Sequence, residues 1–283
     1  MGYEENNNGL KLLCDVKNIL GECPYYKNGD ISFVDIIGKK IIVFNKEIKK
    51  INFNEKIGSA IPLEDDGFLI CAESGLFIYK NNEIKEYKKL KNIIKDGMRI
   101  NDAKVDGLGR LWFSIMVDDG INEPNGALYC LKNNELLLMQ DNVKLGNGLA
   151  FSNDFKYFYY IDSILKELYV YDFDLKNCII KNKKVLHKFD EATPDGMTID
   201  LNDNLFIALW GGGRVEVRSN KTGELLDFIK IPTKLVTSCT FSGVNYDELI
   251  ITTASLNQND EYAGKVFKLK TKYKGKKENY YKI

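Results

Sequence analysis

Histidine is nearly absent from this sequence, since His187 is the only one among 283 residues. A cysteine nucleophile needs an adjacent base, most often histidine, so a cysteine–histidine catalytic pair is disfavoured. The six cysteines are scattered along the chain, and no two of them form a CxxC pair. That spacing argues against a zinc finger or a disulfide framework and favours reduced thiols.

Net charge and long apolar runs are also missing. Forty basic residues balance forty acidic ones, which argues against a nucleic-acid partner or a basic membrane-binding patch. No 18 apolar residues follow one another, so we expect no membrane span. Residues 1–9 are polar and rich in asparagine; we expect a flexible N-terminus without a signal peptide and a cytoplasmic protein.

What the sequence does contain is a repeat of short strand-like runs rich in Tyr, Phe, Val and Ile. Helical patterning is almost absent. Six runs resemble one another, and they are Ile31–Ile36, Phe68–Ala72, Arg110–Met116, Tyr157–Ser163, Asn204–Trp210 and Glu248–Ala254. Turns precede them near residues 30, 67, 109, 155, 203 and 247, at intervals of 37, 42, 46, 48 and 44 residues. A period of about 40 to 50 residues is typical of four-stranded propeller blades.

The repeat therefore predicts an all-β fold, a six-bladed β-propeller with four antiparallel strands in each blade. A β-sandwich would not require one period repeated six times. We expect residues 10–283 to form a single domain. The apolar stretch Leu10–Cys14 precedes the first copy and is expected to pair into the last blade and close the ring. Trp112 and Trp210 are expected in the core between blades, and the lysines from Lys265 to Lys282 on a solvated face.

The phase of the repeat selects residues that share one height on the propeller axis. The positions eight residues before each turn begin the innermost strands, and they hold Glu22, Ser59, Asn101, Asn147, Asp195 and Cys239. Two carboxylates converging in a channel are costly unless a cation compensates their charge. Glu22 and Asp195 with the carbonyl oxygen of Asn147 form an oxygen ligand set that suits calcium, magnesium, manganese or zinc. Each residue taken alone would more often serve to hydrogen-bond a strand end.

At these same positions the sequence resembles the gluconolactonase/regucalcin family of sugar lactonases, also called the senescence marker protein family. The resemblance extends from about Leu20 to about Leu269. It rests on six motifs in order: Leu20–Pro24 (LGECP), Arg99–Asp106 (RINDAKVD) with Gly109–Trp112 (GRLW), Asn147–Ser152 (NGLAFS), Pro194–Met197 (PDGM), Leu209–Arg214 (LWGGGR), and Thr237–Phe241 (TSCTF) with Thr252–Ala254 (TTA).

The resemblance implies a six-bladed propeller that hydrolyses a sugar lactone with one divalent metal cation. The family's metal ligands fall on Glu22, Asn147 and Asp195, and its general acid/base falls on Asp195. Its substrate-binding arginine and asparagine fall on Arg99 and Asn101. An acidic substrate contact of many members has its nearest counterpart in Asp119, which has a shorter side chain.

Other interpretations stay open. A non-enzymatic calcium-binding regulatory protein would need the metal ligands but not Arg99, and a related propeller esterase or phosphotriesterase would share the metal. An interaction propeller would need neither carboxylate. For Arg99, the structural alternative is an ion pair with a carboxylate such as Asp102. The expected partner is a small-molecule sugar lactone, and we expect neither a nucleic acid nor a membrane as a partner. A monomer is compatible with the sequence, which leaves the oligomeric state open.

Overall fold

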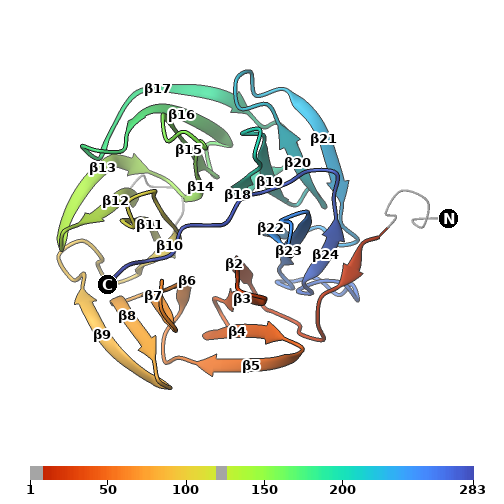
Figure 1. Ribbon diagram of the computed structural model, residues 1–283, viewed down its shortest axis with the longest axis horizontal. Coiled ribbons are helices and arrows are strands. Elements are labelled where there is room, and N and C mark those ends of the chain that lie inside the picture. The colour runs from red at the N-terminus through yellow and green to blue at the C-terminus, as the bar shows by residue number, and fades with distance from the viewer. Residues whose placement is uncertain (1–8, 119–125) are drawn as a thin grey trace.

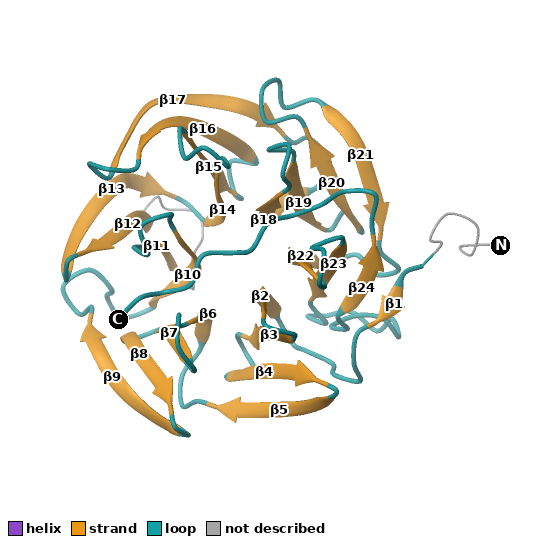
Figure 2. Cartoon of the chain, viewed as in Figure 1, coloured by secondary structure: helices purple, strands orange, loops and turns teal. Residues whose placement is uncertain are grey.

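Six four-stranded antiparallel sheets are arranged in a ring around a central axis (Figure 1). The computed structural model describes residues 9–118 and 126–283. The described residues contain strands, turns and loops but no helix (Figure 2). Accordingly, none of them forms a helix that could cross a membrane. The fold is the predicted six-bladed β-propeller.

Blades 1 to 5 each take four consecutive strands of the chain, and the first of these lies innermost; blade 6 has β22 innermost and takes its outer strand from the other end of the chain (Figure 1). Blade 1 contains β2 (Gly21–Lys27), β3 (Asp30–Asp35), β4 (Lys40–Asn45) and β5 (Glu47–Asn52). Blade 2 contains β6 (Ile57–Pro62), β7 (Phe68–Ala72), β8 (Gly75–Lys80) and β9 (Glu83–Lys89). Blade 3 contains β10 (Met98–Val105), β11 (Leu111–Val117), β12 (Gly126–Lys132) and β13 (Glu135–Val143). Blade 4 contains β14 (Gly146–Phe151), β15 (Tyr157–Asp162), β16 (Glu167–Asp174) and β17 (Ile179–Lys188). Blade 5 contains β18 (Thr193–Ile199), β19 (Leu205–Trp210), β20 (Arg214–Arg218) and β21 (Leu225–Lys230). Blade 6 contains β22 (Val236–Ser242), β23 (Glu248–Thr253) and β24 (Phe267–Lys270), and β1 (Lys11–Leu12) completes it.

The six similar runs of the sequence form the second strand of each blade, as the repeat predicts. The predicted closure is also confirmed. Strand β1 pairs antiparallel with β24, with Lys11 opposite Lys268 and Leu12 opposite Phe267. The first described strand is therefore the outer strand of the last blade, and the ring has no open seam between blades 6 and 1.

Every innermost strand carries a β-bulge close to its start. The shifts in pairing fall after Glu22, Ile57, Ile100, Asn147, Pro194 and Val236. A bulge inserts an extra residue, increases the local twist and redirects a side chain, and bulges are common beside active sites. Here the bulges occur at the height that the repeat phase had selected.

Two glycines show how closely the inner strands approach one another at this height. A Cβ atom on Gly58 would lie 2.3 Å from the carbonyl oxygen of Ile100, in the neighbouring blade. Gly148 has a φ of 45°, and a Cβ there would lie 2.7 Å from the carbonyl oxygen of Asp195. Glycine at these bulges lets adjacent blades pack backbone against backbone.

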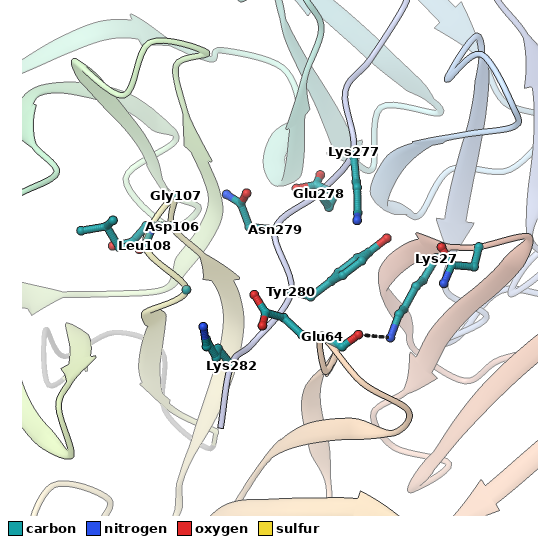
Figure 3. A pocket seen from close by; sticks show the side chains of 12 residues that line it. Lys27, Glu64, Asp106, Gly107, Leu108, Lys277, Glu278, Asn279, Tyr280 and Lys282 are labelled. Carbon is teal, nitrogen blue, oxygen red and sulfur yellow. Dashed lines mark hydrogen bonds between the residues drawn. The ribbon is translucent and has the colours of Figure 1, made fainter.

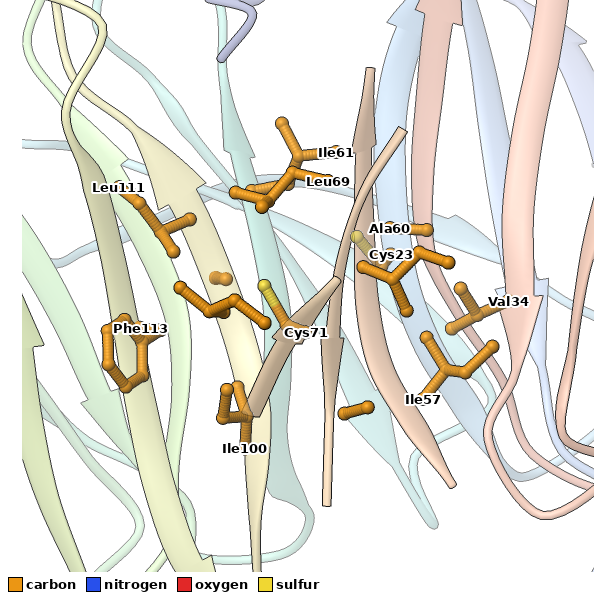
Figure 4. Packing of buried hydrophobic residues seen from close by; sticks show 14 of the residues in the cluster. Cys23, Val34, Ile57, Ala60, Ile61, Leu69, Cys71, Ile100, Leu111 and Phe113 are labelled. Carbon is orange, nitrogen blue, oxygen red and sulfur yellow. The ribbon is translucent and has the colours of Figure 1, made fainter. Parts of the chain in front are cut away.

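The core lies between the blades, where the apolar faces of neighbouring sheets meet. Figure 4 shows Cys23, Val34 and Ile57 on one side of the cluster and Leu111 and Phe113 on the other, with Cys71 between them, so that one cluster joins blades 1 to 3. Trp112 is fully buried between blades 3 and 4, with its ring against Phe151, Phe158 and Phe173. The prediction for Trp112 is thus confirmed. The prediction for Trp210 is wrong: it is the last residue of β19, where the strand leaves the sheet, and it is partly exposed.

Residues 271–283 form a segment that we call the C-terminal strap. It leaves β24 and crosses the end of the ring past β18 to β10, with the C-terminus close to blades 2 and 3 (Figure 1). Its backbone bonds to the ends of several inner strands: the amide of Leu201 donates to the carbonyl of Lys274 at 2.8 Å, and the amide of Tyr281 donates to the carbonyl of Pro62 at 3.0 Å. The expectation of a merely solvated lysine-rich tail is therefore incomplete, because the residues between the exposed lysines pack across the channel.

Candidate functional site

The predicted ligand residues lie at one mouth of the central channel, which we call the near mouth. Glu22, Asn147 and Asp195 belong to the starts of the inner strands β2, β14 and β18. Asn147 is 6% exposed and Asp195 is 8% exposed, and Glu22 is partly buried. The strap contacts the opposite ends of the inner strands, so it covers the far mouth.

Burial and neighbouring charges raise the pKa of both carboxylates. Burial raises the pKa of Glu22 well above its usual value, and the negative charges of Asp195 and Asp102 raise it further. Burial also raises the pKa of Asp195 well above its usual value, and Asp102 adds to this effect. Arg99 lowers both pKa values by a smaller amount. Among residues 9–118 and 126–283, neither Glu22 nor Asp195 has a salt-bridge partner. The near mouth therefore concentrates negative charge that the described residues leave uncompensated.

Asn147 is held so that its amide oxygen faces the same mouth. Its Nδ2 donates to Ser163 Oγ at 2.8 Å, and Ser163 Oγ donates to the carbonyl oxygen of Pro194 at 2.7 Å. Its Oδ1 accepts a hydrogen bond from Asn101 Nδ2 at 2.6 Å. A carbonyl oxygen has two lone pairs, so one remains for a further partner.

Arg99 and Asn101 are joined in the same network. Arg99 Nη1 donates to Asn101 Oδ1 at 2.7 Å and to the carbonyl oxygen of Ile100 at 3.1 Å. Arg99 Nε donates to Asp118 Oδ1 at 2.7 Å. The structural alternative, an ion pair of Arg99 with a strand-end carboxylate, is present in the structure, but the partner is Asp118 at the end of β11 and not Asp102.

Hydrogen bonds thus form a continuous chain through the near mouth. It passes from Asp118 through Arg99, Asn101 and Asn147 to Ser163. The sequence analysis missed Asp118 and Ser163. Ser163 could have been found, since it ends the fourth similar run, whereas Asp118 carries no repeat signal. Asp119, the predicted substrate contact, lies outside the described residues.

The other two positions in phase have structural roles. Ser59 Oγ donates to the carbonyl oxygen of Asn101 at 3.1 Å, which ties blade 2 to blade 3. The Cys239 thiol contacts the carbonyl oxygen of Phe206 at 3.5 Å. Burial raises the pKa of Cys239 and of Cys23 to about 12 in each case. Neither thiol is suited to act as a nucleophile at neutral pH, and His187 lies on the outer strand β17.

Deeper in the channel the charges are balanced by the protein itself. Burial raises the pKa of Asp102 to about 6, although the nearby Lys104 ammonium opposes the shift. Lys104 Nζ lies 2.8 Å from Glu278 Oε1, which comes from the strap. The lower channel therefore pairs its carboxylate Glu278 with a lysine. At the near mouth, by contrast, Glu22 and Asp195 form no salt bridge with any described residue, and the Arg99 guanidinium is paired with Asp118.

A cavity of about 640 Å³ lies at the far mouth, between the strap and the turns that end the inner strands (Figure 3). Tyr280 lies near its centre, with Lys27 and Lys277 on one side. Glu278 lines this cavity and is paired with Lys104, so the cavity is on the opposite side of that ion pair from Glu22 and Asp195.

The donor set at the near mouth fits a divalent cation. No cluster of three or more His, Cys, Asp or Glu side chains with metal-binding geometry occurs in residues 9–118 and 126–283. The candidate set differs in kind, since it combines two carboxylates with an amide oxygen. Hard cations prefer such oxygen ligands, and a bound cation would supply the missing countercharge.

Comparison with known proteins decides the family. Residues 20–255 match the protein family described as the SMP-30/gluconolactonase/LRE-like region. The chain belongs to this family. It is 33% identical to regucalcin of Danio rerio over 268 residues, covering 90% of each chain. It is 31% identical over 254 residues, covering 86% of each chain, to a Bacillus subtilis protein whose name assigns it, provisionally, as a sugar lactone lactonase.

Solved structures agree with this assignment. A luciferin-regenerating enzyme superposes with a TM-score of 0.90 and 30% identity, covering 97% of this chain and 99% of that one. A calcium-binding protein, regucalcin, from Agrobacterium tumefaciens also superposes with a TM-score of 0.90, covering 97% of each chain, at 20% identity. The second likeness supports the propeller fold alone.

Proposed function

We propose that the protein hydrolyses a sugar lactone to the corresponding aldonic acid with one divalent cation, held by Glu22, Asn147 and Asp195. The observation that carries the proposal is the pair of carboxylates at the near mouth: Asp195, which is buried, and Glu22, which is partly buried, lie beside the oriented amide oxygen of Asn147 and form no salt bridge with any described residue. Family membership supplies the reaction class, because lactonases occur among the relatives.

A divalent cation bound there would polarise the lactone carbonyl and lower the pKa of a bound water molecule. Calcium, magnesium, manganese and zinc are the candidates, since all accept oxygen ligands. Glu22 and Asp195 would supply its countercharge, and Ser163 would keep the Asn147 oxygen directed toward it.

Asp195 is the proposed general acid/base. As the water oxygen attacks the carbonyl carbon, Asp195 takes the proton that the water loses. When the bond from that carbon to the ring oxygen breaks, Asp195 returns the proton to the ring oxygen, which leaves as a hydroxyl group. One positioned acid/base of this kind typically contributes about 10² to 10⁴ in rate.

Arg99 and Asn101 are proposed to bind the sugar. Arg99 is planar and permanently charged, and its position is fixed by Asp118 and Asn101. Planar, pre-oriented donors suit sugar hydroxyls and a carbonyl oxygen. Asp119 stays a proposed further contact.

The test is hydrolysis of gluconolactone and other aldonolactones by metal-free protein reconstituted with each of the four cations. We expect hydrolysis with at least one cation and its loss in Asp195→Ala. Full activity in an Asp195→Ala protein that still binds the cation would contradict the proposed role of Asp195.

A second candidate is a non-enzymatic calcium-binding protein, because several relatives carry the name regucalcin. The orientation of Arg99 favours chemistry, since holding an ion requires no guanidinium. Calcium binding with no hydrolysis of any lactone would favour this second function. Aryl esters and organophosphates in the same screen would reveal a propeller esterase or phosphotriesterase. All six cysteines are free thiols, which supports a reducing compartment such as the cytoplasm as the proposed location.

A further inference from the structure

The Asp118 carboxylate forms ion pairs with two basic side chains, Arg99 and Lys56, that come from different parts of the ring. Asp118 follows directly on β11, and its Oδ1 accepts from Arg99 Nε at 2.7 Å. Its Oδ2 pairs with Lys56 Nζ, which comes from the segment leading into blade 2. The backbone amide of Asp118 donates to the carbonyl oxygen of Gly97 at 2.7 Å, so the carboxylate is anchored through its main chain as well.

This arrangement determines which edge of the Arg99 guanidinium is free. Nε is bound by Asp118, and Nη1 is bound by Asn101 and Ile100. Nη2 makes no hydrogen bond within the described part of the chain. Because the guanidinium is planar and rigid, fixing two of its nitrogens also fixes the direction of the third.

The electrostatic surroundings add a second consequence. Arg99 is 7% exposed and donates to Asn101, whose Nδ2 donates in turn to the Asn147 oxygen, so its charge lies beside the candidate metal ligands. Burial would raise the pKa of Asp118, but hydrogen bonds from Lys56 and Arg99 bring it below its usual value, so the carboxylate is charged beside the guanidinium. Without that negative charge, Arg99 would be drawn toward Glu22 and Asp195 and would compete with a cation for them.

We propose that Asp118 is a positioning residue for Arg99: it directs the Nη2 edge toward the substrate and keeps the guanidinium away from the two metal-binding carboxylates. Lys56 in turn holds Asp118 in place. The inference rests on the proposed lactonase function and identifies what orients its substrate-binding arginine.

The test compares Asp118→Asn, Asp118→Glu and Lys56→Gln with the wild type. For Asp118→Asn we expect KM for the lactone to rise about tenfold, as for one lost charge-assisted interaction. The loss in kcat should be much smaller, because Asp195 is unchanged. Asp118→Glu should have a KM between those of Asp118→Asn and the wild type. Lys56→Gln should also raise KM, by a smaller factor than Asp118→Asn.

The structure offers a matched control at the far end of the same blade. Asp106 Oδ2 accepts from Arg110 Nε at 2.6 Å, in an aspartate–arginine pair like that of Asp118 with Arg99. Asp106→Asn removes a buried carboxylate from the same sheet without touching the near mouth. It should lower the melting temperature and leave the KM of the folded enzyme unchanged.

A second measurement does not depend on activity. Titration of Mn²⁺ or Ca²⁺ into chelator-treated protein should give a several-fold weaker Kd in Asp118→Asn than in the wild type, and no change in Asp106→Asn. Wild-type activity with unchanged KM and unchanged cation affinity in Asp118→Asn overturns the inference while the proposed function stands. A wild type that hydrolyses no lactone overturns the proposed function, and the cation titration then decides the role of Asp118 alone. A wild type that also binds no cation overturns both.

Discussion

Removing the Glu278 carboxylate should destabilise the protein through a single buried charge. Glu278 reaches from the C-terminal strap into the channel, where its Oε1 lies 2.8 Å from Lys104 Nζ and accepts from Thr198 Oγ1 at 3.2 Å. Both members of the ion pair are 14% exposed. In Glu278→Ala the Lys104 ammonium stays buried without this carboxylate.

The magnitude follows from that burial. Breaking a buried ion pair by removing one partner typically costs about 3 to 5 kcal/mol. With an unfolding entropy of about 2.1 cal/mol/K per residue, a domain of 283 residues loses about 1.7 °C in melting temperature for each kcal/mol. We therefore expect Glu278→Ala to melt about 5 to 8 °C below the wild type. Glu278→Gln should lose less, because its amide oxygen can still accept hydrogen bonds from Lys104 and Thr198.

Scanning calorimetry at fixed pH, with chelator in the buffer, measures this effect free of any bound cation. The double variant Lys104→Met/Glu278→Leu should recover much of the loss, because neither charge is then buried. A melting temperature within 2 °C of the wild type for Glu278→Ala would refute the reasoning, since it would mean that the Lys104 ammonium finds other compensation.

Three further predictions concern the metal, the single histidine and the core. A divalent cation at 100 times its Kd should stabilise the wild type by about 2.7 kcal/mol, and Asp195→Asn should lose most of the corresponding thermal shift. The pKa of His187 should lie below 6.5, first because of burial and second because of the Arg218 charge. As the pH falls below 6.5, the imidazole is protonated in the unfolded chain before it is protonated in the folded protein, so the free energy of unfolding should decrease until the pH has passed the folded pKa. NMR titration of the single imidazole measures the folded pKa, and Arg218→Met should raise it. Trp112→Ala should lower the free energy of unfolding, measured by urea denaturation, by about 3 to 5 kcal/mol, because the indole is fully buried and donates to Asp106 Oδ2 at 2.9 Å.

The sequence predicted those features that repeat. Blade number, second strands and the height of Glu22, Asn147 and Asp195 all follow from a period that the chain copies six times. Ring closure followed from the apolar stretch that precedes the first copy. Each of these depends on backbone pairing, which a period-2 pattern with turn residues encodes locally.

Features that occur once were not predictable in this way. The bond from Arg99 to Asp118 joins the two ends of a β-hairpin, and nothing in the sequence distinguishes it from a bond to Asp102. The C-terminal strap has no repeat phase at all, so its course depends on contacts that its own residues make with strand ends far away in sequence. Trp112 is the second residue of β11, whereas Trp210 is the last residue of β19, so the two do not share a blade position and Trp210 is partly exposed.

The two ends of the described chain secure the ring in different ways, and this has a consequence for the order of folding. Strand β1 completes blade 6 through only two residue pairs, while the strap reaches across to Pro62 in blade 2 and to Val105 in blade 3. Blades 1 to 5 can each form from contiguous chain as a ribosome releases it. The last blade and the cover of the far mouth both wait for residues beyond 266. A ribosome-stalled chain ending before residue 266 should therefore contain β22 and β23 but neither β24, to which β1 pairs, nor the strap, so that blade 6 is incomplete and the far mouth is uncovered.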